Sequence, residues 1–284
     1  MKVSIIIPTF NEEKAIRDCL NSLAKQSYSD MEIIVVDDGS TDKTVEVLSS
    51  LQFTVYSLQT LKQKHLGPGE ARNLGAKNAL GEILVFVDAD MTFDKYFIKN
   101  LVAPIVSGKT IGTFSKEEYV LNKDNVWSRC WNINKGLPLD RMHPKDYPDT
   151  QSVFRAILKK EFDKVGGFTP IGYVDDYTLS EKLKALATEA PGAIFYHKNP
   201  QNLSEVFQQA RWIGKSVYKR RKIKNEILMK FFSIIRYSPL FTLINGTVKS
   251  LLFGIPHFLV FKFVYDLGVE ISLLGSFFGE QKYK

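Results

Sequence analysis

Cysteine is scarce in this sequence, and the two that occur form no recognisable pattern. Cys19 and Cys130 lie far apart, and neither belongs to a CxxC redox motif or to a set with zinc-ligand spacing. Their scarcity favours a reduced, cytoplasmic setting over the disulfide-rich folds of small secreted proteins. We expect both to be ordinary core residues.

Long apolar runs are also missing. The first one, residues 3–7, is too short for a signal peptide and ends at Pro8, so it predicts a first β-strand and no export. The C-terminal tail contains three charge-free segments, residues 237–248, 250–261 and 271–279. Each is shorter than the roughly 18 to 20 residues that a membrane-spanning helix needs.

Negative charge is scarce in the tail as well. Residues 206–284 carry 13 Lys or Arg but four Asp or Glu, a net charge of +9, whereas residues 1–205 sum to −2. Six of these basic residues lie within residues 215–224. Apolar segments beside a basic cluster favour helices that lie on an anionic cytoplasmic membrane surface. A helical cap packed on the domain and a kinked single span remain as alternatives.

The excess of basic residues is not accompanied by a nucleic-acid-binding motif. The sequence has no zinc finger, RNP motif or basic-zipper pattern. We therefore expect no nucleic-acid partner.

What the sequence does have is a regular alternation of strand-like and helix-like segments. Short apolar runs such as residues 32–37 and 82–88 alternate with amphipathic stretches such as residues 12–25 and 70–80. This alternation predicts an α/β fold with a mostly parallel, Rossmann-like sheet covered by helices, followed by C-terminal amphipathic or hydrophobic helices. Hydrophobic residues make up 44% of the chain, enough for a core of that kind.

Two carboxylates stand at the end of one predicted strand. Asp88 and Asp90 follow the apolar run 83–87, and because side chains alternate along an extended strand, both point the same way. Such a pair could hold a hard divalent cation, Mg²⁺ or Mn²⁺, with phosphate oxygens filling the other positions. A turn with a helix N-cap around Asp90 is the plain structural alternative.

Polar clusters follow two further segments, and ligands of parallel sheets bind where strands end. Asp37 and Asp38 end the second strand, where two adjacent carboxylates suit hydrogen bonds to a nucleobase N–H or to ribose hydroxyls. The segment GPGEARNLGA, residues 67–76, places glycines before a helix, which allows close backbone approach and favours an anion. It lacks both the GxGxxG and the GxxxxGK[ST] spacing, so dehydrogenase and P-loop interpretations are weak.

In their order and spacing, these segments resemble a family 2 glycosyltransferase with the GT-A fold. The resemblance covers about residues 1–225 and rests on IIIPTFNEE, VVDDGSTD, GPGEARNLGA, VFVDAD, GGF followed by VDDYTLSEKL, and QQARW. Several ordered motifs make it highly specific. It implies a nucleotide-sugar half over residues 1–112, an acceptor half over 113–225 and a separate helical, membrane-associating segment over 226–284.

The resemblance also implies roles for individual residues. The nucleotide and its phosphates would be bound by Pro8, Thr9, Asn11, Glu12, Asp37, Asp38, Gly67, Arg72, Asn73, Asp88, Arg211 and Trp212, with Trp212 also available to the acceptor sugar. Asp90 would hold the metal, with Asp88 as a second ligand and His197 either completing the set or contacting the diphosphate. Asp176 would be the catalytic base. Many relatives have Glu-Asp where this chain has Asp175-Asp176, so Asp175 stays a second candidate, with helix capping as the structural alternative.

The chemistry explains why such residues would be needed. A nucleotide sugar already carries a good leaving group, so a metal such as Mn²⁺ or Mg²⁺ and nearby cations would neutralise the departing diphosphate. A carboxylate on the opposite side would deprotonate the acceptor hydroxyl for direct attack, with inversion. The sequence thus predicts an inverting hexosyltransferase using a nucleoside-diphosphate sugar. UDP-sugar is favoured from family frequency, and the acceptor would be a polysaccharide, lipid-linked saccharide or glycoprotein glycan on the inner membrane face.

Other functions fit less well. Transfer to polyprenyl phosphate fits less well because an acidic acceptor needs little help from a base, whereas Asp175-Asp176 would supply one. A nucleotidylyltransferase would require a basic, Gly-rich N-terminal loop that is absent, and a glycosidase would have no use for the nucleotide cluster. A processive synthase is disfavoured because long spans are missing despite QQARW. A catalytically silent nucleotide-sugar-binding scaffold is disfavoured because acids occupy every expected position.

Overall fold

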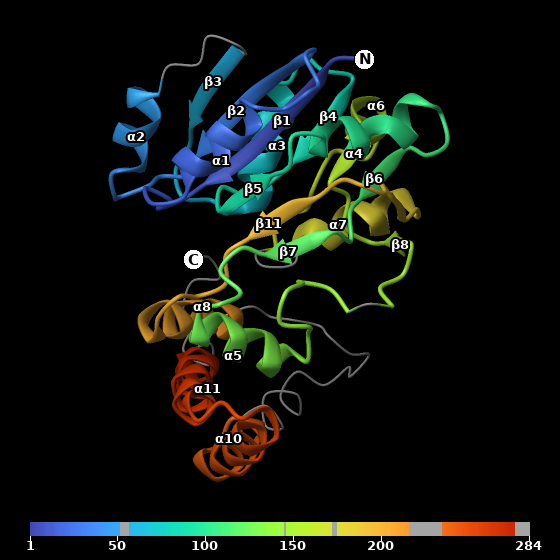
Figure 1. The fold of residues 1–284 in the computed structure, drawn as a ribbon. Helices are drawn as coiled ribbons and strands as arrows, with labels where there is room; N and C mark the ends of the chain where they lie inside the picture. Colours follow the sequence, from blue (N-terminus) through green and yellow to red (C-terminus); the bar gives the residue numbers. More distant parts are fainter. Residues whose placement is uncertain (52–56, 145, 172–174, 216–234, 276–284) are drawn as a thin grey trace. The chain divides into compact units, whose positions relative to one another are not determined.

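The computed structural model describes residues 1–51, 57–144, 146–171, 175–215 and 235–275, shown as a ribbon in Figure 1. The chain divides into two compact units. The first combines Met1–Tyr119 with His143–His197, and the second combines Val120–Met142 with Lys198–Lys284.

The first unit is built on an eight-stranded sheet with the order β3-β2-β1-β4-β9-β6-β10-β8. Its strands are β1 (Val3–Thr9), β2 (Met31–Asp37), β3 (Ser57–Lys62), β4 (Ile83–Phe86), β6 (Gly112–Phe114), β8 (Thr150–Gln151), β9 (Ala156–Leu158) and β10 (Ala187–Glu189). The first four are parallel, and β9 runs antiparallel to both β4 and β6. A second, three-stranded sheet has the order β5-β11-β7, formed by β5 (Met91–Phe93), β11 (Phe195–His197) and β7 (Glu118–Val120).

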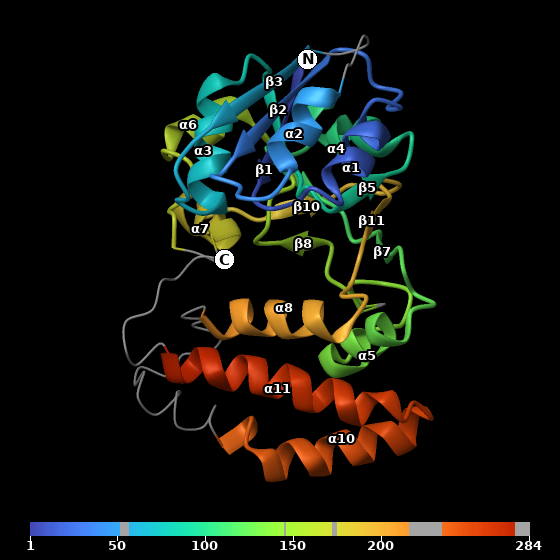
Figure 2. The same cartoon turned by 90° about the vertical axis from the view of Figure 1, so that its left-hand side faces the viewer.

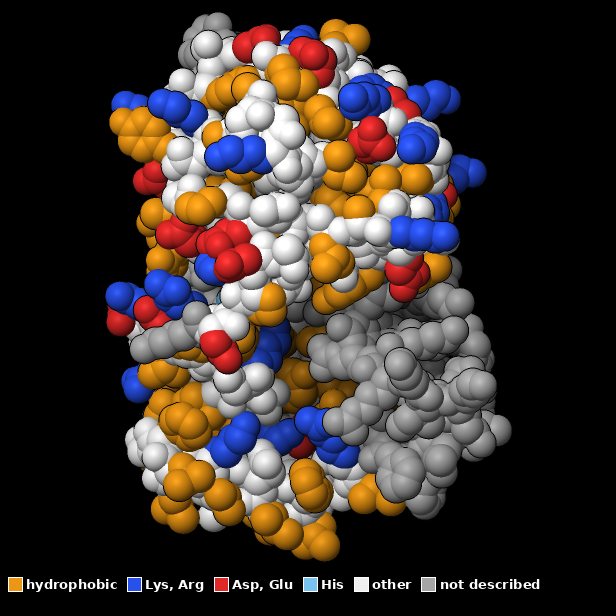
Figure 3. Space-filling model, turned by 90° about the vertical axis from the view of Figure 1, so that its right-hand side faces the viewer, with side chains coloured by type: hydrophobic (Ala, Val, Ile, Leu, Met, Phe, Trp, Pro, Cys, Tyr) orange, Lys and Arg blue, Asp and Glu red, His pale blue; other side chains and the backbone are white. Residues whose placement is uncertain are grey.

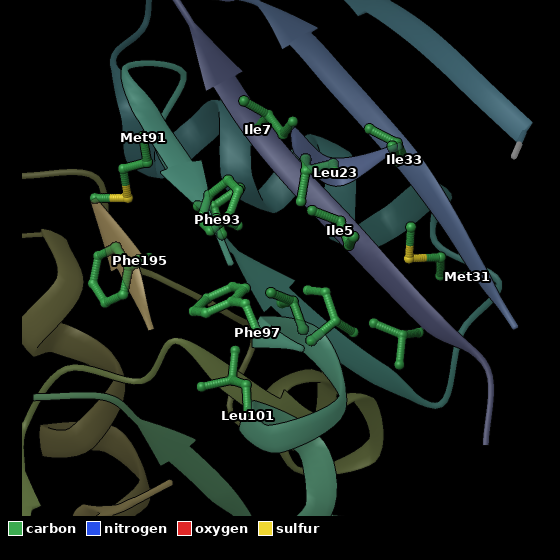
Figure 4. Close-up of a cluster of buried hydrophobic side chains, with 14 of the residues drawn as sticks. Ile5, Ile7, Leu23, Met31, Ile33, Met91, Phe93, Phe97, Leu101 and Phe195 are labelled. Carbon is green, nitrogen blue, oxygen red and sulfur yellow. The ribbon is translucent and has the colours of Figure 1, made fainter. Parts of the chain in front are cut away.

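Helices cover both faces of the large sheet because both sets of alternating side chains are apolar. The helices of this unit are α1 (Ile16–Leu23), α2 (Thr44–Ser50), α3 (Pro68–Asn78), α4 (Phe97–Val106), α6 (Lys159–Lys164) and α7 (Asp175–Leu183). Along β1, Ile5 and Ile7 pack with side chains of α1, α2 and α4, whereas Ile6 packs with side chains of α3, α6 and α7. Figure 4 shows the first of these clusters, where Phe93, Phe97 and Phe195 join Ile5 and Ile7. This double burial is typical of parallel sheets.

The predicted α/β class is confirmed, and the sheet register brings the predicted polar strand ends together. Thr9 at the end of β1 pairs with Asp37 at the end of β2, and β4 ends beside β1 with Phe86 opposite Ile6. The polar segments that follow β1, β2 and β4 therefore leave from one edge of the sheet. Strand β9 covers Ala156–Leu158, and β3 begins at Ser57, directly after residues 52–56, which lie outside the described part.

The second unit is helical. It contains α5 (Val126–Lys135), α8 (Leu203–Lys215), α10 (Pro239–Phe253) and α11 (His257–Gly275), and Figure 2 shows α8, α11 and α10 stacked in that order. Small residues let α8 and α11 approach closely: a methyl group added at Gly268 would lie 2.9 Å from Cβ of Ala210. Because α8 packs on α11, the division of the chain differs from the boundary expected near residue 225.

The C-terminal helices carry many exposed apolar side chains. Leu240, Ile244, Leu251 and Leu252 on α10 are between 56% and 78% exposed. In Figure 3 the hydrophobic side chains gather at the lower end of the picture, where α10 lies. Among the described residues, none of the helices has the length and hydropathy that crossing a bilayer would require. Most of the basic segment 215–224 lies outside the described residues.

Candidate active site

An arginine links two of the acids that the sequence singles out. Arg72 on α3 contacts Oδ1 of Asp88 through Nη2 at 2.9 Å and Oδ1 of Asp176 through Nη1 at 2.5 Å. The guanidinium is buried, and although burial alone would lower its pKa, Asp176 and Asp88 raise the pKa above its usual value. Side chains from α3, from the end of β4 and from α7 thus meet around one fixed positive charge.

A second arginine, Arg155, lies on the other side of Asp88. Its Nη1 is 3.4 Å from Oδ2 of Asp88, and its guanidinium lies over the ring of Phe195 at 5.4 Å. Burial would raise the pKa of Asp88, but Arg72 and Arg155 outweigh it and lower the pKa to about 2. Asp88 is therefore ionised at neutral pH with both oxygens facing arginines.

The two acids at the start of α7 occupy different environments. Asp175 is 1% exposed, and its carboxylate accepts hydrogen bonds from the backbone N–H of Gly69 at 2.9 Å and of Ile171 at 2.5 Å. Burial raises the pKa of Asp175 to about 6 against the lowering effect of these amides and of Arg72. The side chain of Asp176 is 36% exposed. Of the pair, Asp176 is the one whose carboxylate is accessible to solvent.

Asp90 and His197 face each other. Nε2 of His197 lies 3.0 Å from Oδ2 of Asp90, and Nδ1 lies 3.0 Å from Oε1 of the buried Glu118. Burial alone would lower the pKa of His197, but Asp90 and Glu118 raise it well above its usual value. Strand β5, which begins right after Asp90, pairs with β11, with Met91 opposite His197, and this register holds the two side chains together.

The donor atoms of this pair fit a divalent cation. A carboxylate oxygen and an imidazole nitrogen are ligands that Mn²⁺ accepts, and both side chains are partly exposed, at 30% and 24%. Among the described residues, no group of three or more His, Cys, Asp or Glu could hold a metal by itself. A cation here would therefore take its other ligands from a nucleotide diphosphate and water.

The predicted base-binding acids hold the loop after β3 in place. Asp38 accepts hydrogen bonds from the backbone N–H of Leu66 at 2.8 Å and of Gly67 at 2.9 Å. Nδ1 of His65 lies 2.9 Å from Oδ2 of Asp38, and the ring of His65 stacks on that of Phe10 with centroids 4.1 Å apart. Asp37 accepts from the N–H of Ser40 at 3.2 Å. Together these bonds place Phe10 and His65 at the strand ends.

The other predicted nucleotide residues lie at the same edge with structural bonds of their own. Asn11, in a left-handed conformation with φ 56°, accepts from the N–H of Thr41 at 2.8 Å and so joins the segments after β1 and β2. The side-chain amide of Asn73 makes two hydrogen bonds to the backbone of Phe168, each 2.9 Å. Pro8 lies in β1 opposite Val36. Thr9 is buried, and Glu12 donates its backbone N–H to Thr44.

Arg211 and Trp212 are not among the residues that the first unit brings together. Both lie on α8, which belongs to the second unit. Nε of Arg211 is buried and has no hydrogen-bond partner among the residues that the structure describes.

Four side chains that were not predicted belong to these clusters: Arg155, Glu118, His143 and His65. Arg155 could have been singled out from the sequence, because it interrupts the apolar stretch SVFRAIL. Glu118 and His143 could not, since they follow no motif and their positions depend on strand pairing.

Comparisons with known proteins identify the family of this chain. A family model described as Glycosyl transferase family 2 matches residues 4–166, more than half of the chain. The chain is 42% identical over 109 residues to poly(ribitol-phosphate) beta-N-acetylglucosaminyltransferase TarS of Staphylococcus aureus, covering 36% of this chain and 18% of TarS. It is 40% identical over 205 residues to poly(ribitol-phosphate) beta-glucosyltransferase of Bacillus spizizenii, covering 65% and 30%. The matches thus span less than a third of these relatives.

Solved structures share the fold. TarS residues 1–349 in complex with UDP-GlcNAc superimposes with a TM-score of 0.58 at 20% identity, covering 97% of this chain and 92% of that one. The mannosyltransferase PcManGT from Pyrobaculum calidifontis, in complex with GDP-Man and Mn²⁺, gives a TM-score of 0.59 at 17% identity, covering 97% and 87%. These likenesses establish the GT-A fold. The chain belongs to glycosyltransferase family 2 and is a glycosyltransferase.

Proposed function

We propose that this enzyme transfers a sugar from a nucleoside-diphosphate sugar, with a UDP-sugar favoured, to a hydroxyl group of a glycan acceptor with inversion at the anomeric carbon. The observation that carries the proposal is the arrangement of Asp176, Arg72 and Asp88 at the ends of the parallel strands. It supplies an exposed carboxylate and a buried cation side by side. UDP is supported by the UDP-GlcNAc complex of TarS.

In the proposed reaction Asp176 is the base. Its carboxylate takes the proton of the acceptor hydroxyl while the hydroxyl oxygen forms a bond to the anomeric carbon. The bond between that carbon and the diphosphate breaks, and the diphosphate leaves with the electron pair. Arg72, held by Asp88 and Asp176, places a fixed positive charge beside the departing group.

We also propose Asp90 and His197 as the ligands of a divalent cation. Their facing donor atoms fit Mn²⁺ or Mg²⁺, whereas both oxygens of Asp88 face arginines. When bound, such a cation would stabilise the negative charge that develops on the diphosphate.

The proposal leaves the identity of the acceptor to experiment. Two relatives are named as poly(ribitol-phosphate) glycosyltransferases, so that polymer is the first acceptor to test, alongside lipid-linked saccharides and glycan chains. Transfer to a polyprenyl phosphate is less favoured because an acidic acceptor has little need of Asp176. A silent nucleotide-sugar binder remains the alternative from another class.

We further propose that the enzyme associates peripherally with the inner face of the membrane through α10. Eight large apolar side chains of this helix are at least 46% exposed, and clustered exposed apolar side chains mark interaction sites: Leu240, Phe241, Leu243, Ile244, Val248, Leu251, Leu252 and Phe253. The helix contains no acidic residue, and its one basic side chain, Lys249, donates to the backbone oxygen of Ile133. A bilayer offers the apolar phase that matches this face, and the basic residues of segment 215–224 would add attraction to anionic lipid.

The enzymatic proposal is tested by release of nucleoside diphosphate from a panel of UDP-, GDP- and dTDP-sugars with Mn²⁺ or Mg²⁺. We expect turnover of one donor, and we expect Asp176→Asn to lower kcat by about 10²- to 10⁴-fold because the base is lost. Glu181→Gln is the matched control, since Glu181 is an exposed carboxylate on the same helix. Binding of UDP without turnover of any donor, in the presence of every acceptor, would support the silent binder instead.

A further inference from the structure

Four side chains form a continuous string that begins at the proposed metal ligands and passes through a buried carboxylate. Asp90 contacts Nε2 of His197, Nδ1 of His197 contacts Oε1 of Glu118, and Oε2 of Glu118 contacts Nε2 of His143. The three distances are 3.0, 3.0 and 3.1 Å. At the far end of the string, the ring of His143 stacks on Tyr147 with centroids 4.1 Å apart.

Glu118 is an unusual residue to find at such a position. Its side chain is 7% exposed, and a buried carboxylate is costly unless charged or hydrogen-bonding groups surround it. Here both oxygens have a histidine partner, one on each side. In β7, Glu118 and Val120 are buried whereas Tyr119 between them is partly exposed, so the carboxylate points to the buried side of the strand.

The string matters because it determines which ring nitrogen of His197 faces Asp90. A carboxylate beside Nδ1 accepts a hydrogen bond from Nδ1–H, so in the neutral ring the lone pair lies on Nε2. Carboxylates and carbonyls commonly hold metal-binding histidines in this way, and their loss typically weakens metal binding about 10- to 100-fold.

We propose that Glu118 is a positioning residue for the cation: it orients His197 so that Nε2 and Oδ2 of Asp90 converge on one point, and His143 fixes Glu118 from behind. The inference rests on the proposed metal dependence and names residues of this chain that serve it. Glu118 and His143 would not touch the cation, the nucleotide or the acceptor.

The test is calorimetric titration of Mn²⁺ into the full chain in the presence of saturating UDP. We expect the dissociation constant of Mn²⁺ to rise by about 10- to 100-fold in Glu118→Gln and Glu118→Ala. His143→Gln should act in the same direction and by less, because Glu118 keeps its bond to His197. Glu117→Gln is the matched control, since Glu117 precedes Glu118 but bonds to the backbone of Gly192.

Two further measurements separate positioning from a general loss of structure. UDP affinity without metal should be unchanged in the variants, since the nucleotide groups lie on other side chains. The urea midpoint of His143→Gln should stay close to that of Glu117→Gln, so that a loss of Mn²⁺ affinity is not explained by unfolding. If Glu118→Gln disturbs folding, His143→Gln carries the test alone.

The outcomes distinguish this inference from the proposal beneath it. Equal Mn²⁺ affinity in the wild type and in the folded variants would overturn the role of Glu118 and leave the metal-dependent transferase intact. If the wild type takes up no Mn²⁺ with UDP, both the metal site and the role of Glu118 are wrong, while a metal-independent transferase would still show donor turnover.

Discussion

The two adjacent aspartates at the start of α7 have very different surroundings, although they are neighbours in the sequence. Consecutive positions on a helix are about 100° apart, so Asp175 points toward the backbone of Gly69 while Asp176 points toward Arg72. The first binds two backbone amides and is buried, and the second remains accessible. The buried Asp175 thus has a structural role in holding backbone amides, and the exposed Asp176 is the residue proposed as the base.

At the same scale, Arg155 should stabilise the fold through Asp88. We expect Arg155→Met to lower the free energy of unfolding by about 1–3 kcal/mol, because a hydrogen bond between charged groups is lost while Arg72 still holds Asp88. Urea unfolding measures the change. Arg17→Met is the control, since Arg17 lies on the surface of α1 and bonds to Ser50. Equal stability of the two variants would mean that the Arg155–Asp88 contact contributes nothing.

Helices α3 and α7 are joined at the site by contacts of their side chains. Gly69, at the start of α3, approaches Asp175 so closely that an added methyl group would overlap its carboxylate. Asn73 on α3 binds the backbone of Phe168. Helices α3 and α7 are therefore coupled through buried polar contacts, and this coupling sets the distance between Arg72 and Asp176.

The burial of Asp175 at the start of α7 predicts that the stability of the fold depends on pH. Because the pKa of Asp175 is raised to about 6 in the folded protein, the folded state binds more protons than the unfolded state between about pH 4 and 6. Stability from this group is greatest at low pH and falls as pH rises through 6. Relative to Asp175→Asn, the wild type should therefore lose up to about 3 kcal/mol between pH 4 and 7.

Chemical denaturation of both proteins across that range gives the difference directly, and other titrating groups cancel in the comparison. A difference that is constant with pH, or that grows in favour of the wild type above pH 6, would contradict the raised pKa. The asparagine also loses one hydrogen-bond acceptor, which shifts the difference by the same amount at every pH.

At the scale of the whole molecule, the chain combines a catalytic α/β unit with a helical unit that exposes apolar side chains. The helical unit has its own core, in which Trp131 packs against Phe261 and Tyr265. A buried ion pair between Lys262 and Asp266 on α11, with Thr242 of α10 bonded to the same aspartate, joins the two C-terminal helices. The exposed face of α10 is therefore presented by a packed structure.

We expect the full chain to float with vesicles that contain phosphatidylglycerol and to do so less with phosphatidylcholine alone. Leu251→Glu should weaken the association by about tenfold or more, because burial of a leucine contributes about 1.5–3 kcal/mol. Leu80→Glu is the matched control, since Leu80 is 75% exposed on the first unit and Leu251 is 78% exposed on α10. Failure of the wild type to float, or equal loss in both variants, would contradict the membrane proposal.

The sequence by itself determined the class of fold and the edge of the sheet that carries the chemistry. Alternation of apolar strands and amphipathic helices is a local property, and so is the position of Asp37, Asp38, Asp88 and Asp90 at the ends of strands. Since parallel strands end at one edge, the local pattern is enough to place these acids at the same edge. The acidic pair Asp175-Asp176 at the start of α7 is likewise a local feature of the sequence.

Tertiary structure decided which of these side chains meet and which unpredicted ones join them. Arg155 reaches Asp88 across 67 residues, Glu118 reaches His197 across 79, and His197 reaches Asp90 across 107. Such contacts depend on the register of β4 with β9 and of β5 with β11, which no local pattern specifies. Burial likewise separates Asp175 from Asp176, because desolvation depends on what packs above a side chain rather than on its neighbours in the chain.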